Sequence, residues 1–379
     1  MTVKDLLVVM AKAKASDLYL TVDAPPMYRV EGITRPYGEL KLTSQHTEEI
    51  AMSLMNERQK ALFAETMEMN LGLYYPDIGR FRVNIFRQRG AVGIVFRQIK
   101  IEIDTIDDLG LPQILKDISM TKRGLVLVVG GTGTGKSTTL AAMIDYRNTN
   151  APGHIITIED PIEFIHPHRK SIVSQRELGI DTLSYAEALK NTLRQAPDVI
   201  LIGEIRDRET MESAVTFAET GHLCLSTLHA NNANQAIERI MNFFPPEKHD
   251  QIYFQLSLNL RAIISQRLVP TVDGKRAASI EILLDTPRIK DLIMKKRIEL
   301  LKEAMAEGMH EGMMTFDQSL YELYRQGRIS YENAIAYADS ANDLRLRIKM
   351  DEVQQKSAKD EPSKKDGDSP FRLKLDIER

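Results

Sequence analysis

The sequence has little cysteine, no tryptophan and no long apolar run. Cys224 is the only cysteine among 379 residues, which excludes an intramolecular disulfide and a cysteine-rich zinc site and fits a reducing compartment. The longest strand-like apolar runs, residues 125–129 and 199–202, are far shorter than the ~20 residues of a membrane-spanning helix. We therefore expect a cytoplasmic chain without a transmembrane segment, which reaches a membrane only through a partner.

Neither sign of charge dominates the chain, and aromatic residues are few. There are 50 Lys and Arg against 53 Asp and Glu, for a formal net charge of −3, and aromatic residues make up 6%. A protein that tracks along nucleic acid needs a basic groove and stacking aromatic side chains. The composition therefore argues against a nucleic-acid partner.

Hydropathy patterning divides the chain into four parts. Residues 1–100 alternate between short strands and helices, which predicts an α+β domain, and residues 101–112 read as a linker or hinge. Residues 113–350 show the strand–loop–helix alternation of a parallel sheet wrapped by helices. Within them, segments 247–270 and 287–349 read as mainly helical. The charged residues 351–379 predict a disordered tail.

A phosphate-binding loop follows the first apolar strand of the second part. Residues 130–137 read GGTGTGKS and match G-x-x-x-x-G-K-[ST] at every position, with a helix-like segment after them. Glycines let successive backbone N–H groups surround phosphate oxygens, while Lys136 bridges the β- and γ-phosphates and Ser137 ligates Mg²⁺. The predicted cofactors are ATP and Mg²⁺, because the guanine-reading N-K-x-D pattern is absent. The predicted binding residues are Gly130, Gly131, Thr132, Gly133, Thr134, Gly135, Lys136, Ser137 and Thr138.

Acidic side chains stand near the ends of two further strands. The segment IITIEDPIEF (155–164) contains Glu159, Asp160 and Glu163, and PDVILIGE (197–204) ends in Glu204. Parallel strands bring their carboxyl ends to one edge of a sheet. Acids placed there suit general-base work and Mg²⁺ binding. Gly203 occupies the position of the usual Mg²⁺ aspartate, so Glu204 holds the ion through water, polarises the attacking water, or does both.

Two pairs of histidines have the spacing that raises the question of a metal. His222 and His229 lie at the two ends of one strand-like segment, more than about 20 Å apart if it is extended at ~3.3 Å per residue, so a shared metal is excluded. His229 is instead predicted to contact the γ-phosphate or to sense its loss. His166 and His168, on either side of Pro167, are predicted to lie in a surface loop.

The segments GGTGTGKST, IITIEDPIEF, PDVILIGEIRD and GHLCLSTLHANNA occur in this order. They resemble the Walker A, Asp box, Walker B and His box of the secretion ATPase superfamily. With RFRVNIFRQRG (80–90) and VFRQI (95–99), nearly the whole chain is similar to the PilT/PilU family of type IV pilus retraction ATPases. Residues 290–297 depart from the A-I-R-N-L-I segment typical of PilT. This departure and the charged tail favour the PilU branch.

The resemblance implies a fold and a set of residue roles. It implies a PAS-like N-terminal domain, a RecA-like ATPase domain with a helical C-terminal part, and a homohexameric ring that binds ATP between the two domains. Glu163 would be the catalytic base, and Glu204 the Walker B carboxylate. His229 would be the His-box residue, with a less defined role for His222. Arg82 and Arg97 would reach the triphosphate when the domains close.

The same resemblance implies an activity and partners. The chain would power pilus retraction and twitching motility at the cytoplasmic face of the inner membrane, with a companion retraction ATPase ring and a membrane platform protein. A non-autonomous ATP-binding accessory subunit is the first alternative. A nucleic-acid translocase and a small-molecule kinase are weaker ones.

Overall fold

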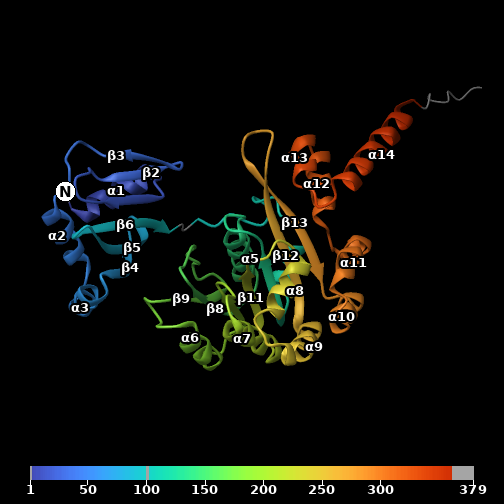
Figure 1. Ribbon diagram of the computed structural model, residues 1–379, viewed down its shortest axis with the longest axis horizontal. Coiled ribbons are helices and arrows are strands. Elements are labelled where there is room, and N and C mark those ends of the chain that lie inside the picture. Colours follow the sequence, from blue (N-terminus) through green and yellow to red (C-terminus); the bar gives the residue numbers. More distant parts are fainter. Residues whose placement is uncertain (1, 100–101, 361–379) are drawn as a thin grey trace, which may run out of the picture.

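The computed structural model describes residues 2–99 and 102–360, with the backbone alone for residues 352–360. Figure 1 shows two separate sheets, one in the N-terminal part of the chain and a larger one in the middle. The expected mixed α/β fold is confirmed. The predicted boundary at residue 100 lies outside the described residues. So does the segment 361–379.

The N-terminal sheet has six antiparallel strands in the order β3-β2-β1-β6-β5-β4. Helices α1 (Val3–Lys12), α2 (Ser44–Leu54) and α3 (Glu57–Thr66) pack on it through one hydrophobic core that includes Leu7, Phe63, Phe81 and Phe96. The strands are β1 (Asp17–Leu20), β2 (Met27–Val30), β3 (Ile33–Pro36), β4 (Glu68–Tyr75), β5 (Gly79–Gln88) and β6 (Ala91–Ile99). Strands β2 and β3 pair as an antiparallel hairpin.

A polar row crosses the sheet on the side away from this core. Asp17, Arg97 and Arg82 are successive register partners on β1, β6 and β5. Directly opposed residues of antiparallel strands point to the same face. The Asp17 side chain is 3% exposed, and its Oδ1 accepts a hydrogen bond of 2.8 Å from Nε of Arg97. A buried carboxylate is thus compensated by an arginine that is itself mostly exposed.

The larger sheet has seven strands in the order β13-β12-β7-β11-β10-β8-β9. All neighbours from β12 to β9 are parallel, and β13 closes one edge as an antiparallel strand. The strands are β7 (Gly124–Val129), β8 (Gly153–Glu159), β9 (Ser171–Glu177), β10 (Val199–Ile202), β11 (Leu223–Leu228), β12 (Leu260–Pro270) and β13 (Arg276–Leu284). The predicted parallel sheet is therefore present.

Helices cover both faces of this sheet, as the fully apolar strands require. One core joins the sheet to α4 (Ile114–Ser119) and α5 (Lys136–Asn150). The other joins it to α6 (Tyr185–Thr192), α7 (Arg208–Glu219), α8 (Ala233–Met241), α9 (His249–Asn259), α10 (Pro287–Met294) and α11 (Leu301–Glu307). Cys224, in the middle of β11, is fully buried, and burial raises the pKa of its thiol.

Three further helices, α12 (Phe316–Arg325), α13 (Tyr331–Ala336) and α14 (Ala341–Asp360), form a C-terminal group with its own small core. Helix α14 projects away from the body (Figure 1). It continues to Asp360, ten residues into the segment predicted as a disordered tail, because Ala, Gln, Lys and Glu favour helix whatever their net polarity. No helix in the described part of the chain is long and apolar enough to cross a membrane.

The sequence analysis did not predict strands β12 and β9. β12 occupies the second half of segment 247–270, which was predicted to be helical. β9 was not predicted. The reason in β12 is that Ala262, Ile263 and Ile264 are all buried, so the segment lacks the alternation that distinguishes a strand from a helix.

A buried carboxylate joins β13 to the start of α8. Oε1 of Glu281 accepts hydrogen bonds from the backbone N–H of Ala233 (2.8 Å) and from Oγ of Ser265 on β12 (2.7 Å). Burial raises the pKa of Glu281, although both hydrogen bonds act against this shift. The two hydrogen bonds tie β13 to β12 and to the first residue of α8.

Removal of Arg97 should destabilise the N-terminal domain. Arg97→Ala leaves the buried Asp17 carboxylate with weaker partners, and we expect a loss of about 1–2 kcal/mol in the free energy of unfolding. Thermal unfolding of the full chain measures it. Asp17→Asn/Arg97→Ala should recover part of the loss, and a double variant as unstable as the sum of the two single variants would contradict the pairing.

Glu281 should give the chain a measurable pH dependence of stability. Its pKa is higher in the folded than in the unfolded chain, so the folded state binds the proton more tightly and its stability falls as the pH rises above the usual glutamate range. Glu281→Gln should remove this part of the fall in melting temperature as the pH is raised above the usual glutamate range. The exposed Glu57→Gln is the matched control, and parallel curves for wild type and Glu281→Gln would contradict the prediction.

Candidate nucleotide site

The phosphate-binding loop lies between β7 and α5, against the neighbouring strand β12. Gly135 has φ +89°, and a Cβ there would lie 2.8 Å from Nε2 of Gln266. A Cβ on Gly130 would lie 2.6 Å from the backbone oxygen of Gln266. Both positions therefore require glycine, because β12 approaches the loop too closely for any side chain. The loop ends at the N-terminus of α5, where the helix dipole favours an anion.

Lys136 begins α5 and folds back over the loop. Its Nζ donates hydrogen bonds to the backbone oxygens of Gly130 (3.0 Å) and Gly131 (2.9 Å). Burial lowers the pKa of Lys136, while the negative charges of Glu204 and Glu163 act in the opposite direction. The predicted carboxylates are thus close enough to influence the lysine electrostatically.

Glu204 lies just beyond the end of β10 and has both of its oxygens paired. Oε2 accepts from Nε of Arg206 at 2.8 Å, and Oε1 lies 3.1 Å from Nε2 of His229, which follows β11. Arg206 also contacts Asp160 at 3.2 Å. Arg206 and His229 therefore fix the orientation of the Glu204 carboxylate from two sides.

One cavity of about 230 Å³ brings the predicted residues together. Its lining includes Lys136, Ser137, Glu163, Glu204 and His229, contributed by four segments of the sequence. A second cavity of about 800 Å³ shares Lys136, Ser137 and Glu163 and extends along β12 and β13. Its further lining residues include Leu109, Leu111, Leu268, Arg276 and Ala278. The two together have a polar end at the loop and a more apolar end beside the sheet edge.

Two buried titratable groups form the wall beside Glu163. Burial raises the pKa of Glu159 to about 7, against hydrogen bonds from Thr157 (2.6 Å) and Gln175 (3.3 Å) that lower it. His166 is only 6% exposed, and burial lowers its pKa to about 4. The prediction of a surface loop is therefore wrong for His166. Its backbone N–H donates to Gln175 on β9, the strand that the sequence did not predict.

Arg82, Arg97 and His222 are not among the residues that line the two cavities. Arg97 pairs with Asp17, and Arg82 lies near Glu177 of β9, where its charge opposes the rise of the Glu177 pKa caused by burial. The N-terminal sheet comes close to this region, because a Cβ on Gly72 would lie 3.6 Å from Cδ1 of Ile180. His222 is at the opposite end of β11 from His229, beside Thr220.

Arg206, Tyr185 and Gln266 are among the lining residues that escaped the sequence analysis. Arg206 had an available signal, since it stands two residues after Glu204. Tyr185 and Gln266 had none, because each comes from a segment whose position in the fold could not be read from its own pattern.

The residues fit ATP and Mg²⁺ as ligands. The loop offers backbone donors, a buried lysine and a helix N-terminus, which suit phosphates. Within residues 2–99 and 102–351, no group of three or more His, Cys, Asp or Glu side chains could hold a metal ion. Mg²⁺ is usually bound by one or two protein ligands together with substrate phosphates and water. Ser137 and Glu204 both line the cavity beside the loop.

Comparisons with known proteins agree with this geometry. The family described as "Type II/IV secretion system protein" matches residues 80–324. The chain is 57% identical over 351 residues to the Type IV pilus ATPase PilU of Pseudomonas aeruginosa, covering 92% of each chain. It is 43% identical to the Type IV pilus retraction ATPase PilT of the same organism, covering 88% of this chain and 97% of that one.

Solved structures give the same result. The structure of the pilus retraction motor PilT with bound ADP is 41% identical in sequence and superposes with a TM-score of 0.85. The match covers 91% of this chain and 99% of that one. The ATPase DotB of Legionella pneumophila, 26% identical, has a TM-score of 0.71 and is covered over 95% of its length by 88% of this chain. From motif order, sheet topology and these similarities together, the chain belongs to the type II/IV secretion system protein family, within its PilT/PilU group of ATPases.

Proposed function

We propose that this protein is an ATP-hydrolysing motor for type IV pilus retraction and twitching motility, of the PilU type. The observation that carries the proposal is the single cavity lined by Lys136, Ser137, Glu163, Glu204 and His229. Four distant segments meet there, as in an ATPase site between strand ends. The names of the two Pseudomonas aeruginosa relatives, a pilus ATPase and a retraction ATPase, support the biological role.

In the proposed mechanism, the chain holds ATP rigidly while one carboxylate handles the proton. Backbone N–H groups of residues 130–138 and Nζ of Lys136 bind the phosphates. Glu163 orients a water molecule and accepts its proton as it attacks the γ-phosphoryl group. Ser137, and Glu204 directly or through water, would hold Mg²⁺, which would supply positive charge at the phosphates. His229 fixes Glu204 and is placed to respond to the γ-phosphate.

The arginines of the N-terminal domain enter the proposal through domain movement. Arg97 pairs with Asp17, and Arg82 lies near Glu177, so Arg97 must exchange its partner to reach a triphosphate. Closure of the N-terminal domain on the ATPase domain about residues 101–112 would make this exchange. Added positive charge would then stabilise the transition state only in the closed form.

The proposed working assembly is a homohexamer. It would act in the cytoplasm, peripheral to the inner membrane, on a platform protein of the pilus machinery and beside a companion retraction ATPase ring. The membrane contact would belong to the partners.

Substitutions of cavity residues should affect ATP binding and ATP hydrolysis separately. Glu163→Gln keeps the size of the side chain but cannot accept a proton, so the hydrolysis rate should fall by about 10²–10⁴-fold with ATP binding retained. Lys136→Ala should abolish tight ATP binding. Phosphate release and equilibrium binding of a fluorescent ATP analogue measure the two effects. Full turnover by Glu163→Gln would exclude it as the base.

The function is tested by ATP hydrolysis across a protein concentration series, with Lys136→Ala as the blank. Specific activity that rises with concentration supports sites completed by ring assembly and an autonomous motor. Activity no higher than the blank would replace the motor with an accessory ATP-binding subunit. Stimulation by DNA would instead favour a translocase.

A further inference from the structure

Strand β12 connects the phosphate-binding loop to the C-terminal helices through three consecutive residues. Ser265 and Arg267 point to one face of the sheet and Gln266 to the other, as the two-residue period of a strand requires. Ser265 is fully buried and Gln266 is 3% exposed. Each of the three side chains has a polar partner on a different structural element.

Gln266 holds the phosphate-binding loop on both sides of Lys136. Its Nε2 donates to the backbone oxygen of Thr134, and its Oε1 accepts from Oγ1 of Thr139, both at 2.7 Å. The amide can do both because its NH₂ group donates while its carbonyl oxygen accepts. Gln266 also lines the 800 Å³ cavity with Gly133 and Gly135. The conformation of the loop is therefore tied to a neutral side chain outside the motif.

Ser265 and Arg267, on the opposite face of β12, connect the strand to α8 and to the C-terminal helices. Ser265 donates to Glu281, which also accepts from the first residue of α8. Arg267 pairs with Asp339 at 2.7 Å, and its guanidinium carbon lies 3.8 Å from the ring centre of Phe316.

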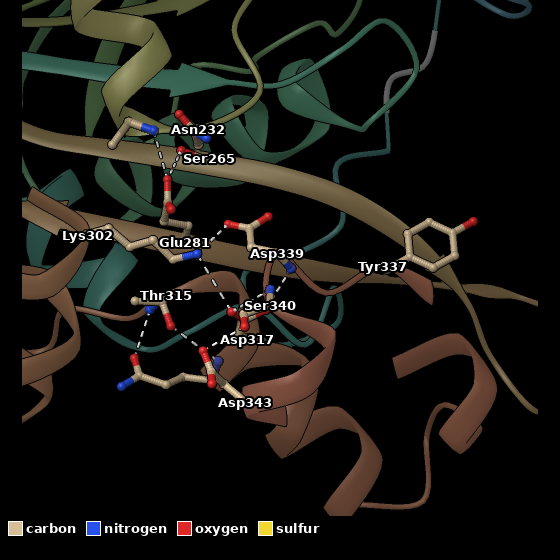
Figure 2. A network of polar contacts seen from close by, with 12 residues as sticks. Asn232, Ser265, Glu281, Lys302, Thr315, Asp317, Tyr337, Asp339, Ser340 and Asp343 are labelled. Carbon is tan, nitrogen blue, oxygen red and sulfur yellow. Dashed lines mark hydrogen bonds and ion pairs between the residues drawn. The ribbon is translucent and has the colours of Figure 1, made fainter. Parts of the chain in front are cut away.

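Figure 2 shows how the pairing continues into the C-terminal group. Nζ of Lys302 lies 3.2 Å from Asp339 and 3.7 Å from Asp317, and Asp317 accepts from the backbone N–H of Asp339 and Ser340. The junction between α13 and α14 is thereby fixed to α11 and α12. A shift of these helices would act on Arg267, the residue next to Gln266.

We propose that Gln266 is a positioning residue of the nucleotide site. It fixes the loop conformation that binds phosphate and links it, through Arg267 and Asp339, to the position of the C-terminal helices. This inference rests on the proposed ATPase function. Two buried hydrogen bonds hold the loop before any nucleotide binds, so their loss should weaken binding more than it slows the chemical step.

The first test compares Gln266→Leu with the wild type and with Gln251→Leu, an exposed position on α9 as the matched control. We expect a tenfold to hundredfold rise in the dissociation constant of a fluorescent ATP analogue and in KM. The maximal hydrolysis rate should change by less than about threefold, since Glu163 and Glu204 stay in place. The control should match the wild type.

A double-variant cycle distinguishes positioning from general loosening of the core. Thr139→Val removes only the hydroxyl that donates to Gln266, so Gln266→Leu/Thr139→Val should bind the analogue no more weakly than Gln266→Leu alone. Additive losses would overturn the shared contact. Gln266→Glu keeps the acceptor for Thr139, but it sets a buried carboxylate against the Thr134 carbonyl and near the phosphates, so it should bind the analogue at least as weakly as Gln266→Leu.

The link to the C-terminal helices has its own test. Asp339→Asn weakens the pairing with Arg267 at a position far along the chain from the loop. We expect the dissociation constant of the ATP analogue to rise a few fold. The rise should be smaller when the same substitution is made in the Gln266→Leu background. Unchanged binding would overturn this part. If Gln266→Leu binds the ATP analogue as tightly as the wild type does, the whole inference is overturned. If the wild type itself does not bind ATP, the proposed function is overturned instead.

Discussion

The parallel register of four neighbouring strands is the constraint on which the site depends. Val129 at the end of β7 pairs with Leu228 of β11, while Ile202 of β10 pairs with Ser226 of β11 and Ile158 of β8. The segment that follows each strand therefore starts from the same edge of the sheet. The loop at 130–137, Glu163, Glu204 and His229 come together because the strands before them are aligned, and Glu204 and His229 are brought into direct contact.

At this edge of the sheet, the charged side chains of Lys136 and Glu204 are held in place by their neighbours. Lys136 is buried among its own loop carbonyls, with two carboxylates near enough to favour its charged form. Arg206 and His229 occupy both oxygens of Glu204, so this carboxylate is oriented before any ligand enters. Preorganised charge of this kind is worth more in a partly dry cavity than in water, because no reorganisation is needed during the reaction.

The sequence was most informative where chemistry and local structure coincide. The glycines of the loop, the strands β7, β10 and β11, and the polar residues after them could be predicted because a motif fixes both the residue types and the flanking elements. Gln266 and His166 could not be, since their positions depend on how β12 and β9 dock against the rest of the sheet. An apolar run such as that in β12 is equally compatible with a buried helix until its neighbours are known.

The N-terminal arginines show a different limit. A motif resemblance assigned Arg82 and Arg97 to the triphosphate, but a sequence does not say which partner an arginine has in a given arrangement of two domains. Here Arg97 compensates the buried Asp17, and Arg82 lies near Glu177 of the other domain. Domain closure, if it moves Arg97, must break its ion pair with Asp17 before that charge can act on a nucleotide.

The chemistry of Cys224 makes this protein convenient for optical work. The chain has one thiol, fully buried in the middle of β11 and held in its unreactive protonated form. A cysteine introduced on each of the two sheets would therefore accept maleimide dyes without competition from the native one. Distances between the domains could then be followed by fluorescence transfer in otherwise wild-type protein, turnover by turnover.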